Sequence, residues 1–299
     1  MMQMLLSPPT SVSPAGAILG EAPLWHPEKK CLFWLDIKGQ RLHCHNTVSG
    51  ENTTYQTTGF VSTIALADQH DFICANQNGF AYLDLDQANT TLTPIVDPEA
   101  DLPGNRFNDG AVDPYGRIWA GTMDNAEVER RGQWWRLDAA GNCELMDNGF
   151  MVTNGPVFDS DRQRIYLTDS ADQTIFRASL SKENTVLEKT VFKQFGEGDG
   201  YPDGMVVDNE GCLWIAFWDG ACVRRLSPDG DVLEKIDVPA LRPTSVEIVA
   251  DTLYITSASI DLTPEQVAAW PHSGSLFKAK LNKPLQRNNN ARFGSGAIA

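Results

Sequence analysis

Short runs of apolar and β-branched residues recur along the chain, and each is followed by a turn and a second, alternating run. The leading runs read LFWLDI, DFICAN, IWAGTM, IYLTDS, LWIAFW and LYITSA, and they start at residues 32, 71, 118, 165, 213 and 253. The following runs read GQRLHCH, GFAYLDL, GQWWRLD, QTIFRASL, GACVRRL and GSLFKAKL, starting at residues 39, 79, 132, 173, 220 and 274. Such runs between turn signals predict β-strands, so each unit contains a hairpin.

The spacing of these units favours one fold. Successive leading runs start 39 to 48 residues apart, which is the size of a four-stranded propeller blade. Six units predict an all-β, six-bladed β-propeller, whereas a large β-sandwich or two small barrels would not explain so regular a spacing. We expect a single domain over residues 1–299, with an ordered core at about 15–284 and flexible termini at 1–14 and 285–299. The segment TPEQVAA at 263–269 predicts a short helix, because Thr263 can cap it and Pro264 suits its first position.

One polar residue stands 8 to 11 positions before each leading run, at the same phase of every repeat. These residues are Glu21, Ser62, Asn108, Asn154, Asp203 and Ser245. Equivalent repeat positions occupy equivalent places in a closed propeller, so we expect these side chains around one mouth of its channel, near the start of each innermost strand. Asn and Asp beside Gly also form turns, as in NDG, TNG and PDG. Because these residues and Glu21 stand at matching positions of the repeat, a shared binding site is favoured over turn formation alone.

Two carboxylates and two carboxamides would then converge on one axis. Packing so many acceptors together is costly unless a cation or strong donors compensate for the repulsion and the lost hydration. Oxygen ligands without thiolate or imidazole suit a hard divalent ion such as Ca²⁺, Mg²⁺ or Mn²⁺. The phase of the repeat therefore predicts a divalent cation site.

The net charge and the hydropathy of the chain indicate which classes of partner it does not bind. It has 24 lysine and arginine residues against 39 aspartate and glutamate residues, a net charge of −15. We expect no nucleic-acid partner, because phosphate binding needs a basic surface. We expect no membrane association either, since no apolar run approaches the roughly 18 residues of a spanning helix.

The cysteines and the first residues bear on the cellular compartment. The six cysteines are scattered and form no C-x-x-C pair, so we expect buried free thiols in a reducing cytoplasm rather than disulfides or a thiolate metal site. The opening MMQMLLSPPTSVSP has neither a basic region nor a full apolar region and is a poor signal peptide. Both features predict a cytoplasmic protein.

Four segments that contain these polar residues resemble one known family. They are GEAPLW at 20–25, NRFNDGAVDPYGRIWAGTM at 105–123, TNGPVFD at 153–159 and YPDGMVVDNEGCLWIA at 201–216. In this order and at this spacing, the chain resembles the gluconolactonase–regucalcin (senescence marker protein) family of six-bladed propellers. The similarity extends roughly from Leu19 to Leu281, and bacterial sugar lactonases look most similar.

The resemblance implies roles for particular residues. The metal ligands of the family fall on Glu21, Asn154 and Asp203. Asn108 lies near the metal and can reach it or the substrate, and Arg106 matches the arginine that holds substrate oxygens. The family also binds sugar hydroxyls through an acidic residue shortly after G-T-M, which here points to Asp124, with Asn125 next to it.

The resemblance also implies an activity, the hydrolysis of a sugar lactone such as gluconolactone or xylonolactone to the aldonic acid. The enzyme would be a hydrolase acting on carboxylic esters, with one divalent ion, Ca²⁺, Zn²⁺, Mn²⁺ or Fe²⁺. The ion would polarise the lactone carbonyl, Asp203 would take a proton from the attacking water, and Arg106 and Asn108 would orient the ring. A metal-bound hydroxide as the nucleophile, with Asp203 mainly a ligand, is an equally credible route.

Fold does not determine function, and three other functions fit the sequence less well. Another metal-dependent esterase or phosphotriesterase could use the same oxygen-ligated ion. A non-enzymatic calcium-binding regulatory protein is a role also attributed to members of the family. A protein-interaction propeller would not need a carboxylate-rich axis, and the chain has no G-H…W-D signature.

Overall fold

The computed structural model describes residues 4–13, 16–183 and 187–295, and almost all of its regular structure is β-strand. The chain divides into two compact units. The first combines Met1–Thr54 with Phe195–Asn288, and the second combines Tyr55–Gln194 with Asn289–Ala299. None of the helices in the described part of the chain is long and apolar enough to cross a membrane.

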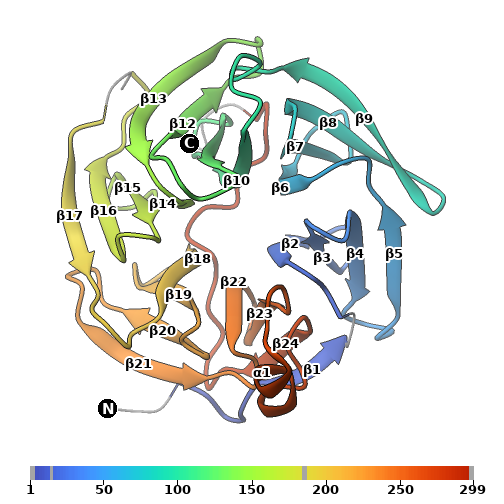
Figure 1. The fold of residues 1–299 in the computed structure, drawn as a ribbon, viewed down its shortest axis with the longest axis vertical. Coiled ribbons are helices and arrows are strands. Elements are labelled where there is room, and N and C mark those ends of the chain that lie inside the picture. Colours follow the sequence, from blue (N-terminus) through green and yellow to red (C-terminus); the bar gives the residue numbers. More distant parts are fainter. Residues whose placement is uncertain (1–3, 14–15, 184–186, 296–299) are drawn as a thin grey trace. The chain divides into compact units, whose positions relative to one another are not determined.

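The first unit contains three antiparallel sheets (Figure 1). One has the order β2 (Gly20–His26), β3 (Cys31–Asp36), β4 (Arg41–Asn46), β5 (Asn52–Gln56), and another has the order β18 (Tyr201–Val207), β19 (Leu213–Trp218), β20 (Cys222–Leu226), β21 (Val232–Asp237). The third has the order β22 (Arg242–Val249), β23 (Thr252–Ala258), β24 (Leu276–Lys280), β1 (Thr10–Ser13). Strand β22 contacts both β2 and β18, so the first strands of the three sheets are neighbours.

The second unit repeats this plan. Its sheets are β6 (Val61–Leu66), β7 (Phe72–Asn76), β8 (Gly79–Asp86), β9 (Asn89–Val96); β10 (Asn105–Val112), β11 (Ile118–Asp124), β12 (Gly132–Leu137), β13 (Cys143–Phe150); and β14 (Thr153–Asp159), β15 (Arg164–Asp169), β16 (Thr174–Ser179), β17 (Lys189–Gln194). Strand β10 contacts both β6 and β14. The sequence predicts separate blades. Gln56, at the end of β5 where the chain enters this unit, instead pairs in parallel with Asn89 of β9. Strands β2 to β9 are therefore hydrogen-bonded in one continuous sheet.

The degree of burial explains why some strands are easier to predict from the sequence than others. The leading runs form the second strand of each sheet, and the following runs form the third strand, as predicted. Strand β3 and strand β11 are buried at every position because side chains on both faces of the sheet are covered. A strand covered on both faces reads as a continuous apolar run. The fourth strands, such as β5 and β17, have mostly exposed or half-buried residues and carry no such signal.

A buried aspartate holds the turn between the first two strands in one sheet of each unit. Asp208 accepts hydrogen bonds from the backbone N–H groups of Glu210 and Cys212, and from Trp214 Nε1 and Arg225 Nη2 at 2.9 and 2.8 Å. In the second unit, Asp113 accepts in the same way from the backbone of Tyr115 and Arg117 and from Trp119 Nε1. Both lie in the pattern D-x-x-G-x-x-W. The ligand atoms of Asp208, Glu210 and Cys212 lie within 4.8 Å of one another, but the donors already occupy both Asp208 oxygens, so this cluster is structural.

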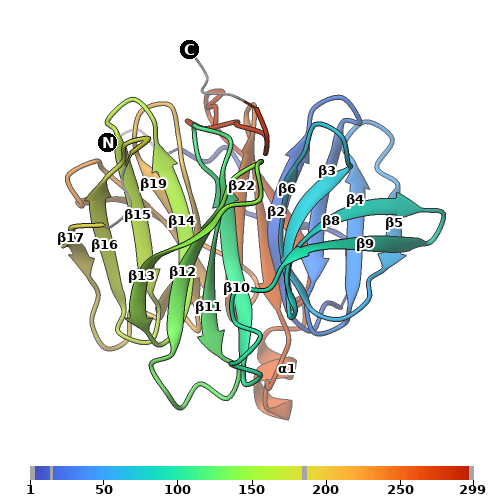
Figure 2. The ribbon, with the colours of Figure 1, turned by 90° about the horizontal axis from the view of Figure 1, so that it is seen from above.

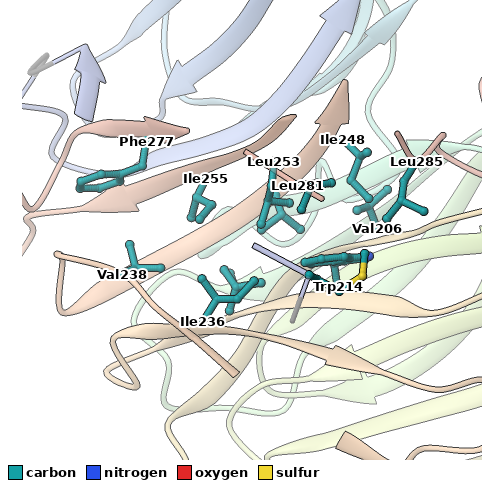
Figure 3. Packing of buried hydrophobic residues seen from close by; sticks show 14 of the residues in the cluster. Val206, Trp214, Ile236, Val238, Ile248, Leu253, Ile255, Phe277, Leu281 and Leu285 are labelled. Atoms are coloured by element: carbon teal, nitrogen blue, oxygen red, sulfur yellow. The ribbon is translucent and has the colours of Figure 1, made fainter. Parts of the chain in front are cut away.

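The core of the first unit fills the space between its sheets and reaches toward both chain ends. Figure 3 shows Val206, Trp214, Ile236 and Leu253 packed against one another. Met4 and Leu285 belong to the same buried cluster.

Several residues predicted to be in flexible termini are packed. Strand β1 completes the third sheet of the first unit by pairing with β24, and Phe293 is buried in the core of the second unit. These parts of the predicted flexible termini, 1–14 and 285–299, are packed, the first through strand pairing and the second through a buried aromatic side chain. Residues 1–3, 14 and 296–299 lie outside the described residues.

The predicted helix is present as α1 (Pro264–Ala269). The Thr263 side chain accepts from the N–H of Gln266, and the Gln266 side chain accepts from the N–H of Thr263, which forms a capping box with Pro264 at the first helical position. The helix buries none of its residues and lies beyond the end of β22 (Figure 2). It is a surface insertion between β23 and β24.

The Asp208 turn gives a first prediction. Asp208→Ala removes the fully buried one of the two carboxylate partners of Arg225, and the other partner, Glu210, is half exposed. The pair that is lost has side chains 0% and 7% exposed, and breaking a buried ion pair costs about 3–5 kcal/mol. We expect the free energy of unfolding, measured with urea, to fall by about that amount. The control Asp229→Ala, at an exposed turn position after β20, should change it by less than about 0.5 kcal/mol. Equal effects of the two substitutions would contradict the structural role of Asp208.

Candidate functional site

An irregularity recurs near the start of every first strand among the described residues. Each strand shifts register against its neighbour, between Glu21 and Leu24, Val61 and Thr63, Phe107 and Asp109, Asn154 and Val157, Pro202 and Met205, and Pro243 and Val246. The six polar residues that the repeat singles out stand at or inside these shifts. A bulge of this kind bends a strand and re-aims its side chains, and it is common beside active sites. The equivalence of the six positions is therefore confirmed within the sheets.

In the first unit, these positions hold two carboxylates and a hydroxyl. Glu21, Asp203 and Ser245 are buried, with 8%, 6% and 7% of their surface exposed. Glu21 Oε2 accepts from the N–H of Ala22 at 2.9 Å, and Ala22 has a left-handed backbone with φ of +48°. A Cβ at Gly204 would lie 2.5 Å from that of Ser245, so the glycine after Asp203 allows β22 to pass closely.

In the second unit, two carboxamides form a pair across neighbouring strands. Asn108 Nδ2 donates to the carbonyl oxygen of Thr153 at 2.8 Å and to Asn154 Oδ1 at 3.3 Å. Asn154 Nδ2 donates to Ser170 Oγ at 2.8 Å, which fixes the amide so that its oxygen faces Asn108. Asn154 is 3% exposed. Among the described residues, the hydrogen bond that this oxygen accepts is the long one from Asn108, so the oxygen suits a cation ligand.

Arg106 is the centre of a second polar group. Its Nη1 donates to Asn108 Oδ1 at 2.8 Å and to the carbonyl oxygen of Phe107 at 3.0 Å, and its Nε donates to Asn125 Oδ1 at 3.1 Å. The guanidinium is buried with the rest of the side chain, which is 8% exposed. The structure thus brings together Arg106, Asn108 and Asn125, three of the four residues predicted to bind substrate.

The fourth of these residues, Asp124, has a different environment. Its carboxylate accepts from the backbone N–H groups of Glu129, Val128 and Ala126 at 3.0, 3.1 and 3.2 Å. These bonds hold the pKa of Asp124 below its usual range, since they stabilise the charged form. Asp124 therefore organises the loop after β11, and Asn125 is the better candidate for contact with a sugar.

Beside Arg106 the second unit has a cavity of about 370 Å³. Its lining includes Arg106, Asn125, Asn105, Glu99, Gln77 and Asn78. The volume lies within the range of ligand pockets. Asn105 and Glu99 are not predicted from the sequence, although Asn105 directly precedes Arg106.

The donor set fits the predicted cation. Glu21 and Asp203 offer carboxylate oxygens in the first unit, and Asn154 offers an amide oxygen in the second. These are the oxygen donors that hard divalent ions take, and burial of the two carboxylates favours a compensating charge. No thiolate or imidazole stands at the equivalent positions in the other sheets, which have Ser62, Asn108 and Ser245.

Comparisons with known proteins agree with the family that the sequence resembles. A family described as "SMP-30/Gluconolactonase/LRE-like region" matches residues 19–259. The chain is 36% identical over 272 residues to a 6-deoxy-6-sulfogluconolactonase of Pseudomonas putida, covering 90% of this chain and 93% of that protein. It is 33% identical over 256 residues to a pentonolactonase of Haloferax volcanii, covering 84% and 86%.

The fold also matches a solved structure. A calcium-binding protein, regucalcin, from Agrobacterium tumefaciens superimposes with a TM-score of 0.87 at 26% identity, covering 95% of this chain and 96% of that one. The fold is thus an all-β propeller.

The loop organised by Asp124 gives a second prediction. Asp124→Ala removes the acceptor of three backbone N–H groups, so the segment 125–131 should loosen. Trypsin should then cleave faster after the partly exposed Arg130 and Arg131, as measured by mass spectrometry of the fragments. Asp138→Ala is a matched control, because Asp138 accepts from Ala140 and Asn142 in another loop of the same unit. The role of Asp124 would be refuted if both variants were cleaved at 130 and 131 like the wild type.

Proposed function

Because the chain belongs to the SMP-30/gluconolactonase/LRE-like family, we propose that it hydrolyses a sugar lactone to the aldonic acid. The observation that carries this proposal is the near full-length identity to two proteins named as sugar lactonases, at 36% and 33%. The polar cavity beside Arg106 and Asn125 supports it, since amide and guanidinium groups suit the hydroxyl and carbonyl oxygens of a sugar lactone. Such an enzyme is a hydrolase acting on carboxylic esters.

We further propose that the chain forms one domain, a six-bladed propeller in which the six first strands surround a single axis. The register shift that all six described first strands share supports this arrangement. In such a propeller, the residues at the shifted position of every blade would face the same central channel. Glu21, Asn154 and Asp203 would meet there and hold one divalent ion. Ca²⁺, Zn²⁺, Mn²⁺ and Fe²⁺ each accept this donor set. When bound, the ion polarises the lactone carbonyl as a Lewis acid.

The residues of the chain position the substrate and move a proton. Arg106 is held by Asn108 and Asn125, so its orientation is set before the lactone arrives. Arg106 and Asn125 donate hydrogen bonds to substrate oxygens and fix the ring. Asp203 accepts a proton from the attacking water as the water oxygen bonds to the carbonyl carbon. The ring C–O bond then breaks, and the leaving oxygen takes the proton from Asp203, which restores the carboxylate and gives the open-chain acid.

The cysteines support a cytoplasmic location. All six are free, five are buried and Cys143 is half-buried. Burial raises the pKa of the Cys74 thiol to about 12 and that of Cys143 to about 11. Such thiols are unreactive and suit a reducing compartment.

The proposed function is tested by the fall in pH on a panel of aldonolactones, with and without a chelator. We expect turnover of at least one sugar lactone, loss of turnover with the chelator, and recovery when a divalent ion is added. Turnover of a phosphotriester in place of lactones would indicate the alternative hydrolase. Binding of Ca²⁺ without any turnover would indicate a regulatory protein.

Substitution of Asp203 separates its two proposed roles. Asp203→Ala removes the ligand and should lower metal content, measured by elemental analysis. Asp203→Asn keeps an oxygen donor but cannot accept a proton, so its rate should fall about 10²–10⁴-fold even at saturating metal. Near-wild-type turnover of the Asn variant at saturating metal would leave Asp203 as a ligand alone.

Substitution of Arg106 tests substrate positioning. Arg106→Ala should reduce kcat/KM for lactones by about tenfold or more, because a charged hydrogen-bond donor is lost, while metal content stays at the wild-type level. Arg106→Lys should recover little, since an ammonium group cannot reproduce the fixed directions of the guanidinium donors. Unchanged activity of the Ala variant would remove Arg106 from the site.

A further inference from the structure

A buried aspartate at the end of β15 holds the segment that leads into β14. Asp169 is 3% exposed, and its carboxylate accepts hydrogen bonds from the N–H of Met151 at 3.0 Å and from that of Val152 at 3.2 Å. Both residues are half-buried and come before the pairing of β14 with β15, which begins at Thr153. Their N–H groups therefore need an acceptor outside the strand ladder, and a carboxylate makes strong, charge-assisted hydrogen bonds.

The next residue continues this anchor. The N–H of Ser170 donates to the carbonyl oxygen of Val152 at 2.9 Å, and Ser170 Oγ accepts from Asn154 Nδ2 at 2.8 Å. Asp169 and Ser170 thus hold both the backbone that precedes Asn154 and the amide group of Asn154 itself. The direction in which the amide oxygen points depends on these two residues.

The first unit has the same arrangement before Glu21. Asp36 is 1% exposed, and its carboxylate accepts from the N–H of Ile18 at 3.2 Å and from that of Leu19 at 3.0 Å. The N–H of Ile37, the next residue, donates to the carbonyl oxygen of Leu19 at 2.9 Å. In both units, the anchored N–H groups stand three and two positions before a proposed cation ligand.

The register of the anchoring aspartate is also the same in both sheets. Asp36 lies opposite Gly20, and Asp169 lies opposite Thr153, so each faces the residue just before the proposed ligand. In the sheet that contains Asp203, the residue opposite Pro202 is Phe217. The anchor therefore accompanies the two proposed ligands to which we assign no proton transfer.

We propose that Asp169 and Ser170 are positioning residues for the cation ligand Asn154, and that Asp36 has the same role for Glu21. This inference rests on the cation site of the proposed function. The anchor fixes the backbone immediately before the bulge, so the bulge presents the ligand oxygen in one direction. Groups that hold metal ligands in this way commonly change metal affinity or activity by about 10–100-fold when they are replaced.

The test measures the affinity of the metal-free protein for Mn²⁺ by electron paramagnetic resonance, without reference to turnover. Asp169→Asn keeps the volume of the side chain but replaces one acceptor oxygen by a donor. We expect its Kd for Mn²⁺, and that of Asp36→Asn, to rise about tenfold or more. Ser170→Ala removes the acceptor of the Asn154 amide without any change of charge and should also raise the Kd.

Two controls separate positioning from the loss of charge or of stability. Asp172→Asn removes a carboxylate that shares Arg130 with Asp169, so it reports the effect of charge. Asp159→Asn alters a fully buried carboxylate at the other end of β14, where it accepts from the N–H and the guanidinium of Arg162 at 3.1 and 3.3 Å. Both controls should keep the Kd within about twofold of the wild type, because neither contacts the proposed ligands. In EDTA, the Tm of Asp159→Asn should fall like that of Asp169→Asn.

Wild-type affinity in Asp169→Asn and Asp36→Asn, or an equal loss in either control, would overturn the positioning role. If Asp169→Asn does not fold, Asp36→Asn and Ser170→Ala are judged by the same criteria. A wild type that binds no Mn²⁺ would overturn the cation site and this inference with it. Binding that depends on the anchor, in a protein that hydrolyses no lactone, would support this inference and contradict the proposed reaction.

Discussion

The structure depends on one constraint that recurs in each sheet. The first strand pairs with the second strand of its sheet, but the register of this pairing shifts near the start of the first strand. A regular strand buried in this way presents mostly apolar side chains, as β3 and β11 do. In β14, for example, the shift lets the strand bury Val157 and still present Asn154 from the irregular section. Each sheet can therefore contribute one polar group without losing its packing, and a ligand set can be assembled from strands far apart in the sequence.

The polar groups beyond these positions are arranged so that one fixes the next. In the second unit, Asn154 fixes Asn108, Asn108 and Asn125 fix Arg106, and Glu99 fixes Asn105. Buried polar groups are stable only when their hydrogen bonds are made. A site held in this way is oriented before substrate binds, and this reduces the cost of ordering on binding. The same network connects Asn154, a proposed cation ligand, with the wall of the cavity.

The sequence predicted the repeat, the second and third strands, the helix at 264–269 and the phase of the polar residues, because each leaves a periodic or local signal. The fourth strands were weakly marked because they are half exposed. The packing of Leu285 and Phe293 could not be foreseen, since isolated apolar residues in a polar tail carry no period. Substrate contact by Asp124 stays a prediction, and the hydrogen bonds that its carboxylate accepts from the backbone of its loop could not be foreseen, because only the folded loop directs those N–H groups toward it. Glu99 and Asn105 were missed because their partners lie 6 to 36 positions away.

The proposed reaction depends most on the proposed convergence of Glu21, Asn154 and Asp203 on one ion. Anomalous diffraction from crystals grown with Mn²⁺ tests it directly. We expect one strong peak with an oxygen of each of the three side chains within about 2.0–2.6 Å. A peak at Asp208 and Cys212, or side chains of the three residues directed to different places, would contradict the account.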